Sequence, residues 1–120
     1  MSDVTTLDPI WHPLMDAPSI WADRCVVCGA PRPLERHHVV RRSQGQLIRD
    51  GRVVKKPVIT LCGRGNVLSM GGRPFCHGLA HHGMLHFRFV DGRYEYLRTR
   101  EPVGYAEALE SPGWAPLRFA

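Results

Sequence analysis

The strongest hydrophobic pattern in the chain is a two-residue alternation between Leu85 and Arg98. Aromatic and aliphatic side chains recur at every second position, which is typical of strands with one buried face. The dipeptide Asp91-Gly92 divides the segment, and Asp-Gly favours a two-residue turn between antiparallel strands. We therefore predict a structural β-hairpin over residues 85–98.

Two further segments carry strand or turn signals. The run from Pro57 to Leu61 is short, apolar and rich in β-branched residues, which predicts a strand. Residues 44–56 form a strongly basic loop or ribbon in which Asp50-Gly51 marks a hairpin turn. Residues 64–75 are predicted to be a loop.

The segment from Cys76 to Gly83 predicts a short helix that ends at Gly83 as its C-terminal cap. A helix here places His77 and His81 one turn apart on one face, where two imidazoles can clamp a metal ion. Gly78 lowers the intrinsic helix propensity, so tertiary contacts or a metal must hold the helix.

The N-terminal residues 1–22 mix prolines with large apolar side chains. The prolines prevent a long helix, and Trp11 and Trp21 are too costly to leave in water. We predict an arm packed over the core, with His12 at its surface.

The C-terminal residues 99–120 are predicted to form an extension with a helical turn at residues 105–109. Trp114, Leu117 and Phe119 are expected to pack back on the core.

Length and composition indicate one small, loop-rich domain. The chain has 120 residues, 43% of them hydrophobic, with ten prolines and twelve glycines. A modest core of this kind often needs an additional cross-link, such as a disulfide or a bound metal. The four cysteines can supply it, either as two disulfides or as a metal site.

The chain carries a formal net charge of +5, and the charge is unevenly distributed. Residues 31–56 contain eight lysines and arginines against two acidic residues, whereas residues 1–23 contain no lysine or arginine. A basic middle beside an acidic arm suggests a phosphate-bearing partner. A generic solvated basic face is the alternative.

The first residues lack the basic start and apolar run of a secretory signal, and no apolar stretch approaches the length of a membrane span. We therefore expect a cytoplasmic protein without a membrane partner. In that compartment clustered cysteines indicate a metal site rather than disulfides.

The motif Cys25-Val26-Val27-Cys28-Gly29 is a Cys-x2-Cys-Gly knuckle. Two thiolates at this spacing can bind one tetrahedral ion, and the glycine permits the tight turn. A small redox protein using Cys25 and Cys28 is the alternative, but a redox motif needs a helix after it, and prolines follow almost at once. One knuckle is half a zinc site, so the other ligands must lie elsewhere.

Residues 36–43 read Arg-His-His-Val-Val-Arg-Arg-Ser. Neighbouring side chains in a strand point to opposite faces, so His37 and His38 are expected to do different jobs. Arg41 and Arg42 follow where a polyanion could be held beside the histidines.

In chain order the motifs are Cys-x2-Cys, His-His, a strand, Cys, and Cys-His-x3-His. This order resembles the HNH endonuclease family and its ββα-metal fold, over about half the chain from Cys25 to His82. It also resembles the subset with a four-cysteine structural zinc. The expected fold class is thus α+β, with a ββα-metal core over residues 23–84 followed by the hairpin.

The resemblance implies two metal sites. A structural Zn²⁺ would be bound by four cysteines, so that metal binding contributes folding free energy. These are Cys25, Cys28, Cys62 and Cys76. His37, His77 and His81 would ligate a catalytic divalent metal such as Mg²⁺, Mn²⁺ or Ni²⁺, and His38 would be the general base.

The activity implied by the resemblance is hydrolysis of DNA phosphodiester bonds. A neutral imidazole can take the proton of water at neutral pH, and a divalent ion can stabilise the phosphate and the leaving oxygen. Arg41 and Arg42 would grip adjacent phosphates, and the family usually has Arg at the second of these positions. Further basic residues expected to contact DNA are Arg49, Arg52, Lys55 and Lys56.

Small proteins of this family are common in phages and mobile elements. The resemblance therefore implies a phage-encoded protein that acts in the host cell and has a protein partner in DNA processing.

Two features depart from the family pattern. Pro57 occupies the position where the family often has an Asn that braces the base histidine, and Asn66 could replace it only if the insert folds back. Thirteen residues separate Cys62 from Cys76, where two are usual. The alternative reading is a zinc-stabilised DNA- or protein-binding module without catalysis.

His82 and His86 are expected to lie at the surface or to support the site. Replacement of His81 by either of them is the alternative.

Overall fold

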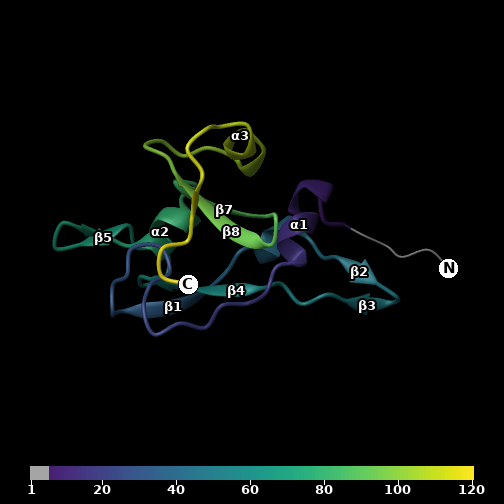
Figure 1. Cartoon of the computed structure of the whole chain (residues 1–120), viewed down its shortest axis with the longest axis horizontal. Helices are drawn as coiled ribbons and strands as arrows, with labels where there is room; N and C mark the ends of the chain where they lie inside the picture. Colours follow the sequence, from purple (N-terminus) through teal and green to yellow (C-terminus); the bar gives the residue numbers. More distant parts are fainter. Residues whose placement is uncertain (1–5) are drawn as a thin grey trace.

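Two small β-layers with short helices between and beside them make up residues 6–120, the part of the chain that the computed structural model describes (Figure 1). Residues 1–5 of the predicted arm lie outside the described residues. The described sheets are all antiparallel, and the mixture of strands and short helices is the predicted α+β class.

The first layer is the strand pair β1 (Leu34–His38) and β4 (Val58–Cys62). Their antiparallel register sets His37 opposite Ile59 and Leu34 opposite Cys62. The predicted strand at β4 is confirmed, and Ile59 and Leu61 are completely buried. Burying such a side chain contributes about 1.5–3 kcal/mol, so this short pair can anchor a small core.

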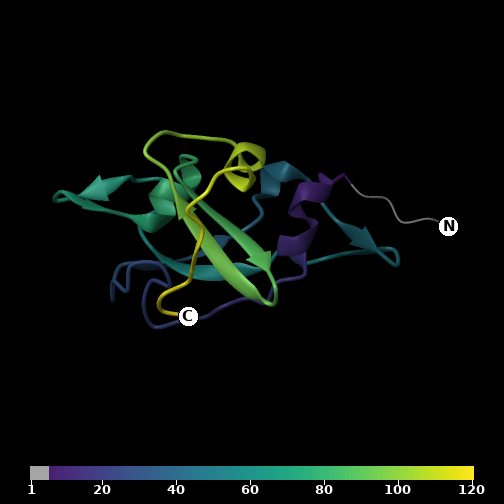
Figure 2. The same cartoon turned by 45° about the horizontal axis from the view of Figure 1, so that its top comes forward.

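The second layer is the predicted hairpin, β7 (Leu85–Val90) and β8 (Arg93–Arg98), which crosses the first layer obliquely (Figure 2). Asp91 and Gly92 have φ values of 52° and 77°, as a two-residue turn between twisted strands requires. The strand β9 (Ala115–Pro116) pairs with β8 and extends the sheet.

The helix α2 (Cys76–His81) packs against both β4 and β7. It ends as predicted, with Gly83 in the left-handed conformation at φ 76°. Gly78 has a packing role in this helix, because a Cβ atom there would lie 1.9 Å from the carbonyl oxygen of Val67. A Cβ on Gly63 would similarly lie 2.6 Å from the Cβ of His77.

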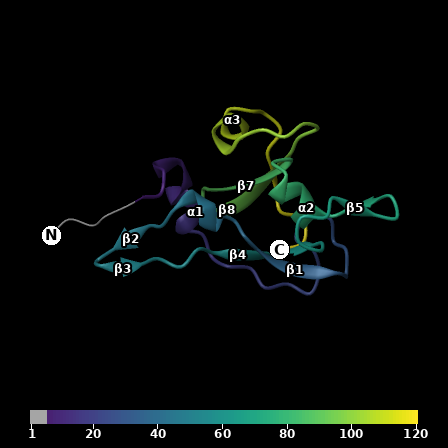
Figure 3. The same ribbon diagram turned by 180° about the vertical axis from the view of Figure 1, so that it is seen from behind.

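Two small hairpins project at opposite ends of the molecule (Figure 3). One consists of β2 (Ile48–Arg49) and β3 (Arg52–Val53), joined at the predicted Asp50-Gly51 turn. The other consists of β5 (Ser69–Met70) and β6 (Arg73–Pro74).

The hairpin β5–β6 corrects the prediction of a loop over residues 64–75. Its turn residues Gly71 and Gly72 both have positive φ, at 60° and 78°. Its strands are only two residues long and include Pro74, so they lack the β-branched alternation that marks strands in a sequence.

The N-terminal arm contains the 3₁₀ turn η1 (Pro9–Trp11) and the short helix α1 (His12–Met15). Leu7 and Leu14 are buried in the core, so the described part of the arm packs as predicted. A second 3₁₀ turn, η2 (Arg42–Gln44), follows β1.

Two predictions for the arm are wrong. Trp21 was expected to be buried, but it is 67% exposed. The guanidinium of Arg36 covers one face of its ring, 4.6 Å from the ring centroid. The amphipathic ring is thus satisfied at the surface by a cation rather than by the core. His12 is half-buried rather than exposed, and its Nε2 is buried without a hydrogen-bond partner among the described residues.

The C-terminal extension returns to the core, where Leu117 packs as expected, whereas Trp114 and Phe119 are half-buried outside the core cluster. The predicted helical turn is α3 (Tyr105–Leu109), and the Tyr105 ring stacks on Trp11 with centroids 4.0 Å apart. The backbone N–H groups of Arg118 and Phe119 donate to the carbonyl of Val26, which brings the end of the chain to the Cys25–Gly29 knuckle.

Candidate metal centres and basic surface

The four cysteines come together from three separate segments. Cys25 and Cys28 lie on the knuckle, Cys62 ends β4, and Cys76 begins α2. Their sulfur atoms all lie within 4.8 Å of one another, and those of Cys28 and Cys62 are 3.6 Å apart. Tetrahedral Zn–S bonds of about 2.3 Å place sulfurs about 3.8 Å apart, so the cluster is compatible with a structural metal such as zinc.

The local backbone and protonation also suit a thiolate site. The backbone N–H of Cys76 donates to the sulfur of Cys62 at 3.4 Å. Hydrogen bonding with Cys62 and Cys76 lowers the pKa of Cys25. Hydrogen bonding with Cys25 raises the pKa of Cys62 to about 11, and hydrogen bonding with Cys25 and Cys62 raises the pKa of Cys76. Without a cation, Cys25 is therefore the thiol that ionises most readily, and a metal ion would displace the protons that remain on Cys62 and Cys76.

Three histidines from β1 and α2 form a second cluster. His37 comes from β1, while His77 and His81 come from adjacent turns of α2, as the helical spacing predicts. Their candidate ligand nitrogens lie within 4.8 Å of one another, and Nε2 of His77 is 3.0 Å from Nε2 of His81. Metal–nitrogen bonds of about 2.1 Å at right angles place two nitrogens about 3.0 Å apart, so the cluster fits one divalent ion.

Burial keeps His37 and His81 in the form that a metal needs. His37 is only 5% exposed, and burial, with the nearby His77 and His81, lowers its pKa well below the ordinary value. Burial likewise lowers the pKa of His81. Neutral imidazoles are the ligand form, so these side chains are ready to ligate at neutral pH.

Glu35 contacts this cluster, and the sequence pattern did not predict a role for it. Its Oε1 lies 2.8 Å from Nδ1 of His77 and also accepts a hydrogen bond from the N–H of Gly65. Burial alone would raise the pKa of Glu35, but these hydrogen bonds lower it overall. An ionised Glu35 fixes the proton of His77 on Nδ1 and leaves Nε2 free to ligate, as carboxylates behind metal-bound histidines do.

His38 lies beside this cluster but is not part of it. It lines a cavity of about 310 Å³ together with Arg42 and Lys56. Both His37 and His38 border a second, open cavity of about 430 Å³. Burial, with the charges of Arg42 and Lys56, lowers the pKa of His38, so it is neutral at neutral pH.

The segment after His38 is held by the stretch that contains Pro57. The N–H of Val39 donates to the Pro57 carbonyl at 3.1 Å, and the Lys56 ammonium donates to the Arg41 carbonyl. Asn66 does not reach His38; its backbone carbonyl accepts instead from Nε2 of His82, at 2.9 Å. The backbone around Pro57 thus steadies the chain next to His38 without an Asn side chain.

The six basic residues predicted to bind DNA divide into two groups. Arg41 donates to the Ala80 carbonyl at the end of α2, Arg49 pairs with Asp16 at 2.7 Å, and Lys56 bonds the Arg41 carbonyl. The other three are exposed, and no hydrogen bond or ion pair within residues 6–120 engages their side chains. They are Arg42, Arg52 and Lys55.

Neither of the two remaining histidines joins a cluster. Nε2 of His82 contacts the Asn66 carbonyl, and Nε2 of His86 lies 2.8 Å from the Gly83 carbonyl. The cluster on α2 is therefore made with His81, as the sequence favours.

Comparison with protein-family models, with curated proteins and with solved structures finds no match to this chain. Among the described residues, no helix has the length and apolar character needed to cross a membrane.

Proposed function

We propose that this chain is a metal-dependent endonuclease of the HNH type that hydrolyses DNA phosphodiester bonds. The observation that carries the proposal is the convergence of His37, His77 and His81 within 4.8 Å, with His38 next along β1. In this reading β1, β4 and α2 form the ββα-metal core, because two antiparallel strands precede a helix that bears two ligands.

The four-cysteine cluster would hold the ends of this core together. A zinc ion there would tie the end of β4 to the start of α2 and both to the knuckle. Cys62 and Cys76 are separated by thirteen residues, yet the β5–β6 hairpin closes that insert and returns the chain to the same point. The long insert is thus compatible with a four-cysteine site.

The histidine cluster would hold the catalytic metal through His37, His77 and His81. When bound, a divalent ion supplies charge stabilisation for the scissile phosphate and the leaving oxygen. His38, neutral and bordering the same open cavity, would accept the proton of the attacking water at its imidazole. Arg42, exposed beside His38, would contact a neighbouring phosphate.

A second candidate is a zinc-stabilised DNA-binding module without catalysis. The observation that favours it is Pro57, which offers only a backbone carbonyl where the family often has an Asn side chain. The exposed basic residues of β3 and of the turn after β1 would serve such a module equally well. It predicts salt-sensitive DNA binding and no cleavage.

The experiment that separates the two is a plasmid-nicking assay with zinc-loaded protein and added Mg²⁺, Mn²⁺ or Ni²⁺. Wild-type protein should convert supercoiled plasmid to the open circle. His38→Ala should abolish this while leaving zinc content and DNA affinity unchanged. His12→Ala is the matched control, since His12 lies on α1 and belongs to neither cluster.

Equal nicking by wild type and His38→Ala would contradict the proposal. Absence of nicking with every ion, together with retained DNA binding, would favour the binding module.

A further inference from the structure

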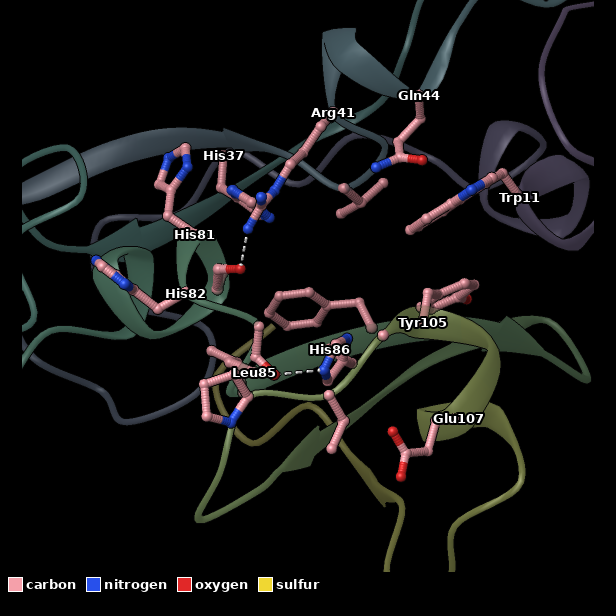
Figure 4. Close-up of a pocket in the computed structure, with 17 residues that line it drawn as sticks. Trp11, His37, Arg41, Gln44, His81, His82, Leu85, His86, Tyr105 and Glu107 are labelled. Atoms are coloured by element: carbon pink, nitrogen blue, oxygen red, sulfur yellow. Dashed lines mark hydrogen bonds between the residues drawn. The ribbon is translucent and has the colours of Figure 1, made fainter.

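A cavity of about 540 Å³ opens on the histidine cluster from the side of the second β-layer (Figure 4). Two of the cluster's histidines, His37 and His81, contribute to its wall, and so does Arg41. All three also border the open cavity that contains His38, so the two cavities meet at the cluster. A ligand with a phosphate at the cluster could therefore extend into this space.

Several aromatic side chains contribute to the walls of the cavity. Trp11 and Tyr105 stack on each other with an interplanar angle of 11°, at the end away from His81 (Figure 4), and Phe87 also lines the cavity. His86 adds a fourth ring, and burial lowers its pKa, so it presents a neutral imidazole. A flat, uncharged ring system would find apolar faces here without burying a charge.

Two further polar groups line the cavity besides the histidines and Arg41. The amide of Gln44, on η2, and the carboxylate of Glu107, on α3, face the cavity from opposite sides (Figure 4). An amide and a carboxylate together both donate and accept hydrogen bonds. The cationic group, Arg41, lies instead at the end near the histidines.

We propose that this cavity binds the base of a nucleotide whose phosphate lies at the histidine cluster. The inference rests on the proposed function, which it deepens by giving the substrate a base-binding subsite. The cavity volume lies in the range of about 300–1,000 Å³ typical of small-ligand sites. Its layout matches the three parts of a nucleotide: a cation for the phosphate, aromatic walls for the base and polar groups for the base edge.

An unpaired base is required, because a base stacked within a duplex cannot enter a side cavity. The preferred substrate would therefore carry a single-stranded end, a nick or a flipped base near the cleaved bond. Aromatic walls tolerate any base, since every base has a π face.

The test measures equilibrium binding of 2′-deoxyguanosine 5′-monophosphate and of 2-deoxyribose 5-phosphate to the zinc-loaded protein. The two probes share the sugar and phosphate and differ only in the base. Neither contains a phosphodiester bond, so binding can be read whether or not the protein cleaves DNA. Base stacking should make the nucleotide bind about tenfold tighter or more.

Two variants that fill the cavity should remove this difference. Gly104→Phe adds a ring at a lining position whose Cβ would meet nothing within 4 Å and whose backbone suits any residue. Gln44→Trp fills the cavity from the opposite side. Ala106→Phe is the matched control, because Ala106 is an exposed α3 residue that does not line the cavity.

Equal affinity for the two probes in wild-type protein would overturn the inference. So would an unchanged preference for the nucleotide in both filled variants. Failure of the proposed function gives a different result, namely no nicking by wild-type protein, and leaves this binding comparison readable.

Discussion

Oε1 of Glu35 lies 2.8 Å from Nδ1 of His77, and this contact joins β1 to α2 directly behind the histidine cluster. Glu35 and His37 are two positions apart on one strand, so both point toward the helix. One face of β1 thereby supplies both a candidate ligand and the carboxylate that orients another ligand.

The first prediction follows from this contact. Glu35→Gln should weaken binding of Mn²⁺ or Ni²⁺ to the histidine cluster by roughly 10- to 100-fold, because His77 loses its negatively charged partner. Isothermal titration of zinc-loaded protein measures this affinity. Glu110→Gln, at an exposed carboxylate after α3, should leave it unchanged. Equal affinities for wild type and Glu35→Gln would contradict the role assigned to Glu35.

The second prediction concerns zinc and the fold. Cys28 is exposed, so Cys28→Ser removes a ligand without leaving a hole in the core. Zinc binding in small domains contributes about 10–16 kcal/mol, comparable with the whole stability of a domain at about 5–15 kcal/mol. Cys28→Ser should therefore abolish cooperative thermal unfolding, as should a chelator added to wild type. Circular dichroism would follow both, and an unchanged melting temperature would argue against a structural metal.

The third prediction concerns the close approach of the insert to α2. Gly78→Ala improves helix propensity by about 1 kcal/mol but forces a Cβ to within 1.9 Å of the Val67 carbonyl. Overpacking of this kind costs about 1–3 kcal/mol, so the variant should be less stable than wild type. Gly104→Ala, where a Cβ meets nothing within 4 Å, is the matched control. Denaturant unfolding compares them, and a stabilised Gly78→Ala would show that the contact yields.

The fourth prediction concerns the exposed basic residues. Arg52→Ala and Lys55→Ala should each weaken DNA binding at low salt and reduce the slope of log affinity against log salt by about 0.9 if each contacts one phosphate. Arg100→Ala is the control, because Arg100 is exposed beyond β8 and far along the chain from the basic segment. Fluorescence anisotropy at several salt concentrations gives the slopes. Slopes that do not differ from that of Arg100→Ala would exclude the β2–β3 ribbon from the DNA interface.

Local signals in the sequence predicted much of this fold. Asp50-Gly51 and Asp91-Gly92 adopt the left-handed conformations of hairpin turns, which depend on the two residues alone. The cysteine knuckle and the one-turn spacing of His77 and His81 are likewise local. The structure brings these groups together within 4.8 Å in each cluster.

What escaped prediction depends on contacts between distant segments. Glu35 looks like any strand carboxylate until α2 places His77 against it, forty-two positions later. Gly78 looks like a weak point in a helix until Val67 is packed against it. Trp21 looks like a core residue, yet Arg36 covers it at the surface. The aromatic cavity has rings from the arm, β7 and α3, so no single stretch of sequence reveals it.

We propose that the chain holds two metal centres of different chemistry, one structural and one that serves the proposed reaction. The presence of two centres is tested most directly by elemental analysis of protein equilibrated with Mn²⁺ after zinc loading, for wild type and for His37→Ala. We predict one zinc and one manganese per wild-type chain, and one zinc without manganese in His37→Ala. Zinc alone in both proteins, or manganese retained in His37→Ala, would contradict the account.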